Sequence, residues 1–185
     1  MKNLPFLLSF LLLSIFGNCK AQDPEPLASQ AYESCCGVEP VEFTTGNAYI
    51  FVPNVFTPNS DGINDYFAPS FNDGILGFDS YLIYTPVGDT LVFATSDYDP
   101  NNIANTAWNG LKQDGAVYTG AFKYEFILYL KDGGRYRVQG QACRIVCGPE
   151  AGVFKTKIGC FYPSQISTTG HLDLSVPSQE ENCFK

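Results

Sequence analysis

A polar turn at residues 59–65 carries the side chains whose types and spacing best suit chemistry. It reads Asn-Ser-Asp-Gly-Ile-Asn-Asp, and oxygen ligands spaced by two around a glycine can converge on calcium. The candidate ligands are Asn59, Asp61, Ile63, Asn64 and Asp65, with Asp73 or Asp97 and Asp99 available to complete the site. In the EF-hand register the twelfth position is Ala68, so the bidentate glutamate is absent. A turn held only by Asn and Asp hydrogen bonds explains the same residues, and both interpretations stay open.

The rest of the sequence offers no arrangement typical of catalysis. His171, the single histidine, lies in a polar segment, where a surface role is favoured over a Ser-His-Asp relay. The chain has no Gly-x-Ser-x-Gly, glycine-rich phosphate loop or His-Glu-x-x-His motif. Glu125 and Asp132 could serve a glycosidase and Trp108 a carbohydrate, but a solvated strand face and a core position are the ordinary explanations. We therefore expect no enzyme, and no cofactor beyond the calcium just considered.

The cysteines indicate disulfide chemistry outside the cytoplasm. Apart from Cys19, which belongs to the N-terminal segment described below, there are six, an even number typical of an oxidising compartment. These are Cys35, Cys36, Cys143, Cys147, Cys160 and Cys183. Zinc is disfavoured because the chain has no Cys-x-x-Cys pair and only one histidine.

The pairing of these cysteines is less constrained. The adjacent Cys35 and Cys36 seldom bond each other in proteins, so they should reach two different partners. Cys143 and Cys147 would lie ~13 Å apart on an extended strand, too far for a bond between them. Pairing of these two with Cys35 or Cys36 is one hypothesis, with Cys160 and Cys183 closing the C-terminal residues on themselves. Six cysteines allow about fifteen patterns, so the pattern stays open.

Residues 1–21 are typical of an export signal. Lys2 supplies the positive charge, and Leu4–Phe16 is apolar but shorter than the ~20 residues of a membrane-spanning helix. Two processing events compete: lipoprotein-type cleavage before Cys19, whose thiol would carry lipid, and ordinary cleavage after Ala21. Both remove Cys19 from the disulfide set, and we favour its lipidation.

The remaining chain is expected to form one domain with two flanking segments. Residues 22–34, which contain Asp-Pro-Glu-Pro, indicate an extended tether, although a plain disordered N-terminus explains them equally well. Residues 35–147 are the predicted domain, and residues 148–185 a cysteine-containing C-terminal extension, with Val153–Ile158 as a candidate strand.

Short strands and turns dominate the predicted domain. The clearest strand is Phe122–Leu130, whose apolar residues alternate and place five large side chains on one face. A strong Asp-Gly-Gly turn follows, and Arg135–Cys147 returns. Further candidate strands are Phe78–Tyr84 and Thr90–Ala94. The apolar runs next to Pro53 and Pro58 are confined to a sheet edge or a strand end, because proline cannot donate to a sheet ladder. The pattern predicts an antiparallel, immunoglobulin-like, disulfide-linked β-sandwich of about seven strands.

Three motifs give a resemblance to a known family. Residues 50–67 contain Val-Pro-Asn-Val-Phe-Thr-Pro-Asn followed by Asp-Gly and Asn-Asp, and later come Trp108-Asn109-Gly110 and Gly120-Ala121-Phe122-Lys123-Tyr124. Over roughly residues 48–147 the chain resembles the gliding motility-associated C-terminal domain, the type B sorting domain of type IX secretion. The resemblance implies a recognition surface for the secretion apparatus, with exposed sheet edges as the contact, and no enzymatic activity. The usual module ends its chain near the return strand, so the extension departs from it.

Composition and resemblance together set the functional expectation. The net charge of −8 argues against nucleic acid, and a lipid anchor is the one membrane contact expected. We expect a non-enzymatic binding or assembly module linked to type IX secretion and gliding, with secretion or cell-surface proteins as partners. It would lie at the outer membrane or cell surface, or be secreted. The alternatives are a free-standing surface lipoprotein without a sorting role, which the extension and the lack of a cargo domain favour, and a small extracellular hydrolase.

Overall fold

The computed structural model describes residues 32, 34–37, 39–155 and 157–185. The predicted signal with Cys19, and the predicted tether apart from Tyr32 and Ser34, lie outside the described residues. Within the described ranges, no helix is long and apolar enough to cross a membrane.

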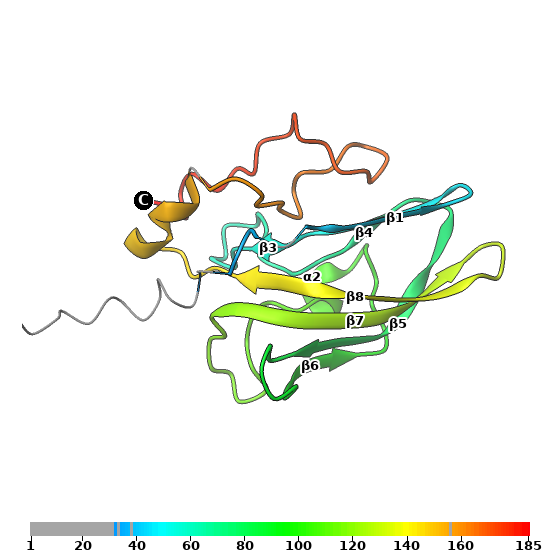
Figure 1. The fold of residues 1–185 in the computed structure, drawn as a ribbon, viewed down its shortest axis with the longest axis horizontal. Helices are drawn as coiled ribbons and strands as arrows, with labels where there is room; N and C mark the ends of the chain where they lie inside the picture. The colour runs from blue at the N-terminus through cyan, green and yellow to red at the C-terminus, as the bar shows by residue number, and fades with distance from the viewer. Residues whose placement is uncertain (1–31, 33, 38, 156) are drawn as a thin grey trace, which may run out of the picture.

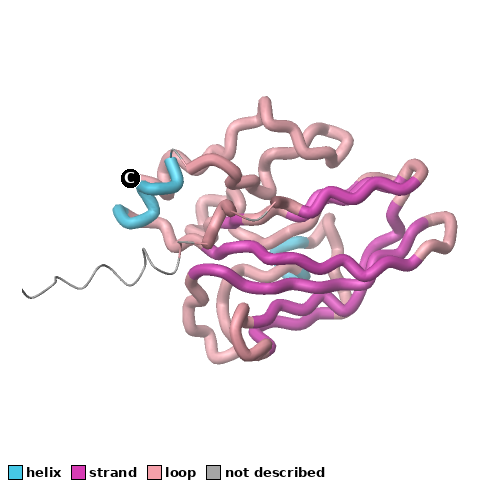
Figure 2. Tube along the Cα trace, viewed as in Figure 1, coloured by secondary structure: helices cyan, strands magenta, loops and turns pink. Residues whose placement is uncertain are grey.

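Eight strands in the described part of the chain form two sheets (Figure 1). They are β1 (Val41–Thr45), β2 (Ala48–Val52), β3 (Val55–Phe56), β4 (Ser70–Phe71), β5 (Ile75–Tyr84), β6 (Leu91–Thr95), β7 (Gly120–Leu130) and β8 (Arg135–Arg144). One sheet has the order β1-β2-β4 and the other β3-β8-β7-β5-β6. All strand pairs are antiparallel except β3 with β8. The predicted all-β sandwich is therefore confirmed, and Figure 2 shows how much of the remaining chain is loop.

The central hairpin β7–β8 forms as the alternating residues predict. Side chains along β7 alternate between buried and half-buried positions over all eleven residues. In the turn, Gly133 has a φ of +90°, and the backbone N–H of Gly134 donates to the Asp132 carboxylate at 2.9 Å. Glycine adopts that left-handed conformation without steric cost, so the Asp-Gly-Gly sequence fixes the hairpin at this point.

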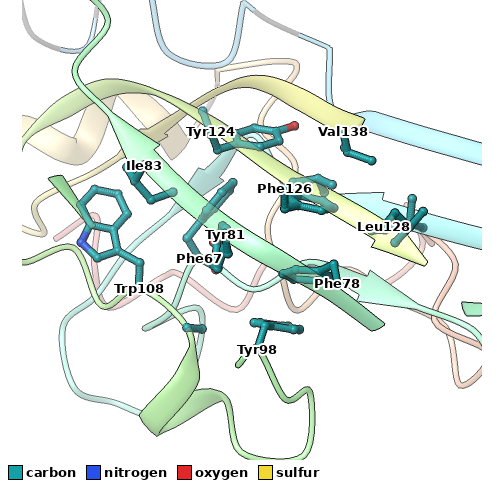
Figure 3. Packing of buried hydrophobic residues seen from close by; sticks show 14 of the residues in the cluster. Phe67, Phe78, Tyr81, Ile83, Tyr98, Trp108, Tyr124, Phe126, Leu128 and Val138 are labelled. Carbon is teal, nitrogen blue, oxygen red and sulfur yellow. The ribbon is translucent and has the colours of Figure 1, made fainter. Parts of the chain in front are cut away.

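Aromatic side chains fill the space between the sheets (Figure 3). The ring of Phe67 lies 4.8 Å from that of Phe122 and 5.2 Å from that of Tyr124, measured between centroids. Trp108 is 1% exposed, which confirms the core interpretation of this residue. Each such ring removes a large apolar area from water, and edge-to-face contacts add to the stabilisation.

Pro53, which separates the apolar runs of β2 and β3, lies where a proline is tolerated. Pro53 follows the last residue of β2, and the two-residue β3 is the edge strand of its sheet. Since proline cannot donate to a ladder, this arrangement loses no strand hydrogen bond.

Two strand predictions are wrong, one at its C-terminal end and the other at all of its described residues. β8 ends at Arg144 rather than Cys147, because the chain leaves the sheet to bring Cys147 to Cys183. The predicted strand Val153–Ile158 is instead occupied by the 3-10 helix η1 (Pro149–Lys155), where proline at the first helical position has no N–H to lose. One further helical turn, α2 (Ile103–Thr106), lies between β6 and β7.

Residues 148–185, called the extension from here on, lie along the outer side of the three-stranded sheet (Figure 1). There the His171 ring stacks on Tyr49 of β2 at 3.7 Å, and the backbone N–H of Leu172 donates to the Tyr49 hydroxyl. All five residues of β2 are buried, although an antiparallel strand with one solvated face would alternate. The extension is therefore a third layer of the fold.

The N-terminal side of the domain contributes to the same layer. Tyr32 is 2% exposed, its ring packs against Phe154, and its hydroxyl accepts the backbone N–H of Val146. The predicted tether of residues 22–34 is thus wrong at Tyr32, because that side chain is held in a second apolar cluster beside η1.

Candidate functional site

The signature segment, residues 53–65, is the part of the domain most closely engaged by the extension. The Asn54 amide donates from Nδ2 to the carbonyl of Gly159 at 2.7 Å and accepts the Phe161 N–H at Oδ1, also at 2.7 Å. The Asn54 backbone N–H donates to the Phe161 carbonyl at 3.1 Å. Asn54 is 2% exposed, so these bonds satisfy a buried amide that would otherwise be costly.

A second anchor joins the same two segments through Glu180. Its Oε1 accepts from the Thr57 hydroxyl and from Asn64 Nδ2, each at 2.5 Å. Asn64 also donates to the Ser178 carbonyl and accepts the Ser164 N–H. A buried carboxyl that accepts two hydrogen bonds from the domain makes Glu180 the main polar attachment of the extension.

The turn within the signature segment is organised around the carboxylate of Asp65. Its two oxygens accept the backbone N–H groups of Asn59, Ser60 and Gly62 at 2.7–2.8 Å. Asp61 accepts the Ile63 N–H at 2.9 Å. Ser60 and Gly62 have positive φ, which turns their N–H groups toward this one acceptor. These are the hydrogen bonds expected of a turn that is held by Asn and Asp side chains without a metal ion.

The calcium hypothesis for Asn59, Asp61, Ile63, Asn64 and Asp65 fits this geometry poorly. Both Asp65 oxygens are occupied by N–H donors, and Asn64 bonds the extension. We expect millimolar calcium or a chelator to move the melting temperature by less than about 1 °C, since a ligand that binds only the folded state raises it. A calcium-dependent rise of several degrees in a thermal scan would contradict this expectation.

Three disulfides in the described residues fix both flanks of the domain. They join Cys35 to Cys143, Cys36 to Cys160, and Cys147 to Cys183. Cys143 pairs with Cys35, one of the two partners hypothesised for it. The hypothesis that Cys147 pairs with Cys35 or Cys36 is wrong, and so is the hypothesis that Cys160 pairs with Cys183. The reason is the early end of β8, which turns Cys147 toward the extension.

One group of potential metal ligands occurs in the described ranges, formed by Cys147, Cys183 and Glu180. Both sulfurs are bonded to each other, so they offer no thiolate to a metal. The group is therefore a disulfide beside a buried carboxylate.

Glu180 is unusual because it is a fully buried carboxyl. Its Oε2 has no hydrogen-bond partner, and burial raises the pKa of Glu180 above its ordinary value. The nearby charges of Asp61 and Asp65 act in the same direction, while the bonds from Thr57 and Asn64 oppose it. Relative to the unfolded chain, the folded state therefore favours the neutral form of this carboxyl.

This preference predicts a pH-dependent effect of Glu180→Gln. A group whose pKa is higher in the folded state than in the unfolded chain stabilises the fold fully at pH values below its unfolded-state pKa. This contribution is lost as the pH rises through its folded-state pKa. We expect the variant to melt roughly 2–4 °C above wild type at pH 8, the shift that about 1 kcal/mol gives, and equally at pH 4. Glu181→Gln, at the exposed neighbouring residue, should melt like wild type at both values. A difference in melting temperature between Glu180→Gln and wild type that does not change with pH would contradict a raised pKa of Glu180.

The second family-like motif, Trp108-Asn109-Gly110, packs against Arg144 of β8. Trp108 Nε1 donates to the Leu111 carbonyl at 2.7 Å, and Arg144 donates to the Tyr118 carbonyl at 2.8 Å. A Cβ on Gly110 would lie 2.1 Å from Arg144 Nε, and the φ of Gly110 is +82°. The glycine is therefore required both by backbone conformation and by the arginine side chain above it.

Gly110→Ala should consequently destabilise the domain by about 2–4 kcal/mol, the sum of a strained φ and a displaced buried side chain. Gly115→Ala is the matched control, because Gly115 has a φ of +81° but open space at its Cβ. We expect the control to cost about 1 kcal/mol in urea unfolding. Equal losses of unfolding free energy for the two variants would show that the Arg144 side chain moves aside at no cost, and would contradict the prediction.

The signature turn and the Trp-Asn-Gly motif meet in space. They line a shared open cavity of about 520 Å³ with Arg144, and Pro58, Asp65, Asn109 and Leu111 are among its walls. Burial lowers the pKa of Arg144. The two motifs, more than forty residues apart, thus form one surface region.

The remaining residues considered for catalysis have separate structural roles. Glu125 pairs with Arg137 on the outer side of β7 and β8, and Asp132 caps the hairpin turn. His171 stacks on Tyr49 at the opposite sheet. The structure brings none of these three together with another, and it gives each a partner of its own.

The outer edge of β6 is the most accessible strand edge of the larger sheet. Its residues, Leu-Val-Phe-Ala-Thr, contain no charge and no proline, which are the usual protections of an edge. In the described part of the chain, β6 pairs only with β5. Leu91 is 42% exposed and Val87, in the preceding turn, is 86% exposed. This edge can accept another strand.

These features define a disulfide-linked β-sandwich domain with an accessible sheet edge at β6 and a surface made by two sequence motifs. Residues 50–141 match the family model described as the CHU_C type IX secretion signal domain. This segment is similar to the type IX secretion signal family, as the resemblance predicted. No curated protein matches the sequence. A type IX secretion signal domain implies a secreted or cell-surface protein.

Sequence reasoning missed the residues that attach the extension. Asn54 and Thr57 carried a usable signal, since they are polar positions inside an apolar stretch that the structure buries. Glu180 carried none, because its partners lie more than 110 residues away.

Proposed function

We propose that this chain is a non-enzymatic recognition module that directs passage through type IX secretion and docks on a surface or secretion protein. The match of residues 50–141 to the secretion signal family carries this proposal. The partner would add a strand to the β6 edge, where main-chain hydrogen bonds supply affinity and the pleat supplies register. Gliding motility is the process in which we place it.

The location follows from the same proposal. Lipidation of Cys19 would hold the domain at the outer membrane, and release without a lipid would leave it secreted. An acidic surface with a net charge of −8 suits protein partners better than phosphate-rich ones.

Absence of enzymatic activity is part of the proposal. It is supported by the separate structural roles of Glu125, Asp132 and His171, the residues with the most suitable chemistry. A general acid or base must lie within hydrogen-bonding reach of its reacting partner, and these three lie apart.

A reporter fusion tests the sorting role. Residues 22–185, which keep all six disulfide cysteines, are fused to a fluorescent protein carrying an export signal and expressed in strains with and without the type IX translocon. We expect the reporter outside the cell only when the translocon is present. Ala94→Lys, which places a charge on the β6 edge, should reduce export several-fold, whereas Val117→Lys, at an exposed position away from it, should not. Export that does not depend on the translocon would contradict the proposal.

A second candidate is a free-standing surface protein that keeps the fold without a sorting role. The bonds of the extension to Asn54, Thr57 and Asn64 favour it, because they bury polar residues of the signature segment. If this candidate is correct, the reporter fusion should not be exported, whether or not it contains the extension.

A further inference from the structure

The extension attaches to the domain as a bound peptide does, rather than as a strand of the sheet. Its hydrogen bonds to the signature segment come from the backbone of Gly159, Phe161, Ser164 and Ser178 and from the Glu180 carboxyl group. None of the residues described beyond 148 belongs to either sheet. The domain side consists of three side chains, Asn54, Thr57 and Asn64, which bond backbone groups and one carboxyl group of the extension.

Two disulfides hold the extension, and both are more accessible than the third. Cys160 and Cys147 are partly exposed, whereas Cys35 and Cys143 are only 1% and 2% exposed. Reduction depends on access of the attacking thiolate or reagent, so the bonds to the extension should open before the one inside the domain. Ile158, 92% exposed, marks a point between η1 and the contacting residues where the chain can be cut.

We propose that Asn54, Thr57 and Asn64 form a binding surface for an extended peptide that carries a carboxyl side chain, and that residues 159–180 of the extension occupy it within the same chain. A partner peptide with backbone groups and one carboxylate in the same arrangement fits the surface when the extension leaves. This inference goes beyond the proposed function, and its test does not depend on secretion.

The shape of the contact supports a separable occupant. A small apolar cluster seals it, with Tyr162 and Phe184 from the extension packing near Val55 and Ile145 of the domain. The main core between the sheets contains no residue beyond 148. Removal of residues 159–185 therefore uncovers polar side chains and a minor cluster while the aromatic core stays packed.

The test uses the full chain with a specific protease site inserted after Ile158. The protein is folded, cut and then mildly reduced, and a synthetic peptide of residues 159–185 with serine for cysteine is added back. We expect the fragment to remain attached until reduction and then to dissociate. Hydrogen exchange should stay slow in β5, β7 and β8, and the peptide should rebind in calorimetry. A peptide carrying Glu180→Ala should bind at least about tenfold more weakly, since the two hydrogen bonds to its carboxyl group are lost.

Four results would overturn the inference. They are a fragment that stays bound after reduction, loss of exchange protection throughout the sheets on its release, no rebinding of the peptide, and equal affinity for the Glu180→Ala peptide. The first two would make the extension an integral part of the fold, and the last two would deny that the surface reads a carboxylate. Each outcome is independent of whether the reporter fusion is exported.

Discussion

Trp108→Ala should lower the free energy of unfolding by about 3–5 kcal/mol, the range for truncating a large buried aromatic. The indole ring is 1% exposed and lies 4.8 Å from the ring of Phe122 and 5.4 Å from that of Phe56. Its backbone carbonyl also accepts the N–H of Phe67 at 2.8 Å, which joins two loops over the core. Removing the ring leaves a cavity where three segments of the domain converge. Urea unfolding followed by circular dichroism measures the loss.

Trp108→Phe is the control for this experiment. It keeps a ring in the core but removes the Nε1 donor to the Leu111 carbonyl, so we expect a loss of about 1–2 kcal/mol. A loss below about 1 kcal/mol for the alanine variant would contradict a closely packed core at this position.

Replacing Cys35 and Cys143 together by serine should destabilise the protein by about 4–5 kcal/mol. The bond closes a loop of 108 residues, and the entropy that a cross-link removes from the unfolded chain grows with the loop length. It also fixes the N-terminal residues beside β3, since Cys143 pairs with Val55 across the parallel strands. Denaturant unfolding of the oxidised variant and wild type gives the difference.

The double serine variant of Cys147 and Cys183 is the matched comparison. Its loop spans 36 residues, so the same relation gives an effect smaller by about 1 kcal/mol. A larger loss from this pair than from Cys35 and Cys143 would show that the extension contributes more to stability than the link inside the domain.

Local patterns predicted the central hairpin, where one strand alternates clearly and a strong turn follows. β7 shows the alternation and β8 follows the Asp-Gly-Gly turn, so both could be placed from sequence. β1 was missed although Val41–Thr45 alternates and a Gly-Asn turn follows. β4 has only two residues, which is too short for any periodic signal.

The candidate site depends on contacts that no local pattern encodes. Asn54 and Phe161 are separated by 107 residues, and Thr57 and Glu180 by 123. The disulfide pattern likewise follows from where β8 ends and the chain turns, which the sequence did not show. The family motifs predicted the domain but not its third layer, because that layer lies beyond the matched residues.

The most direct test of this account is a disulfide map of the native protein recovered from outside the cells, by mass spectrometry without reduction. The account predicts three linked peptide pairs, Cys35 with Cys143, Cys36 with Cys160 and Cys147 with Cys183. Free thiols at these six positions, or protein found only in the cytoplasm, would contradict an exported sandwich whose extension is fastened to its signature segment.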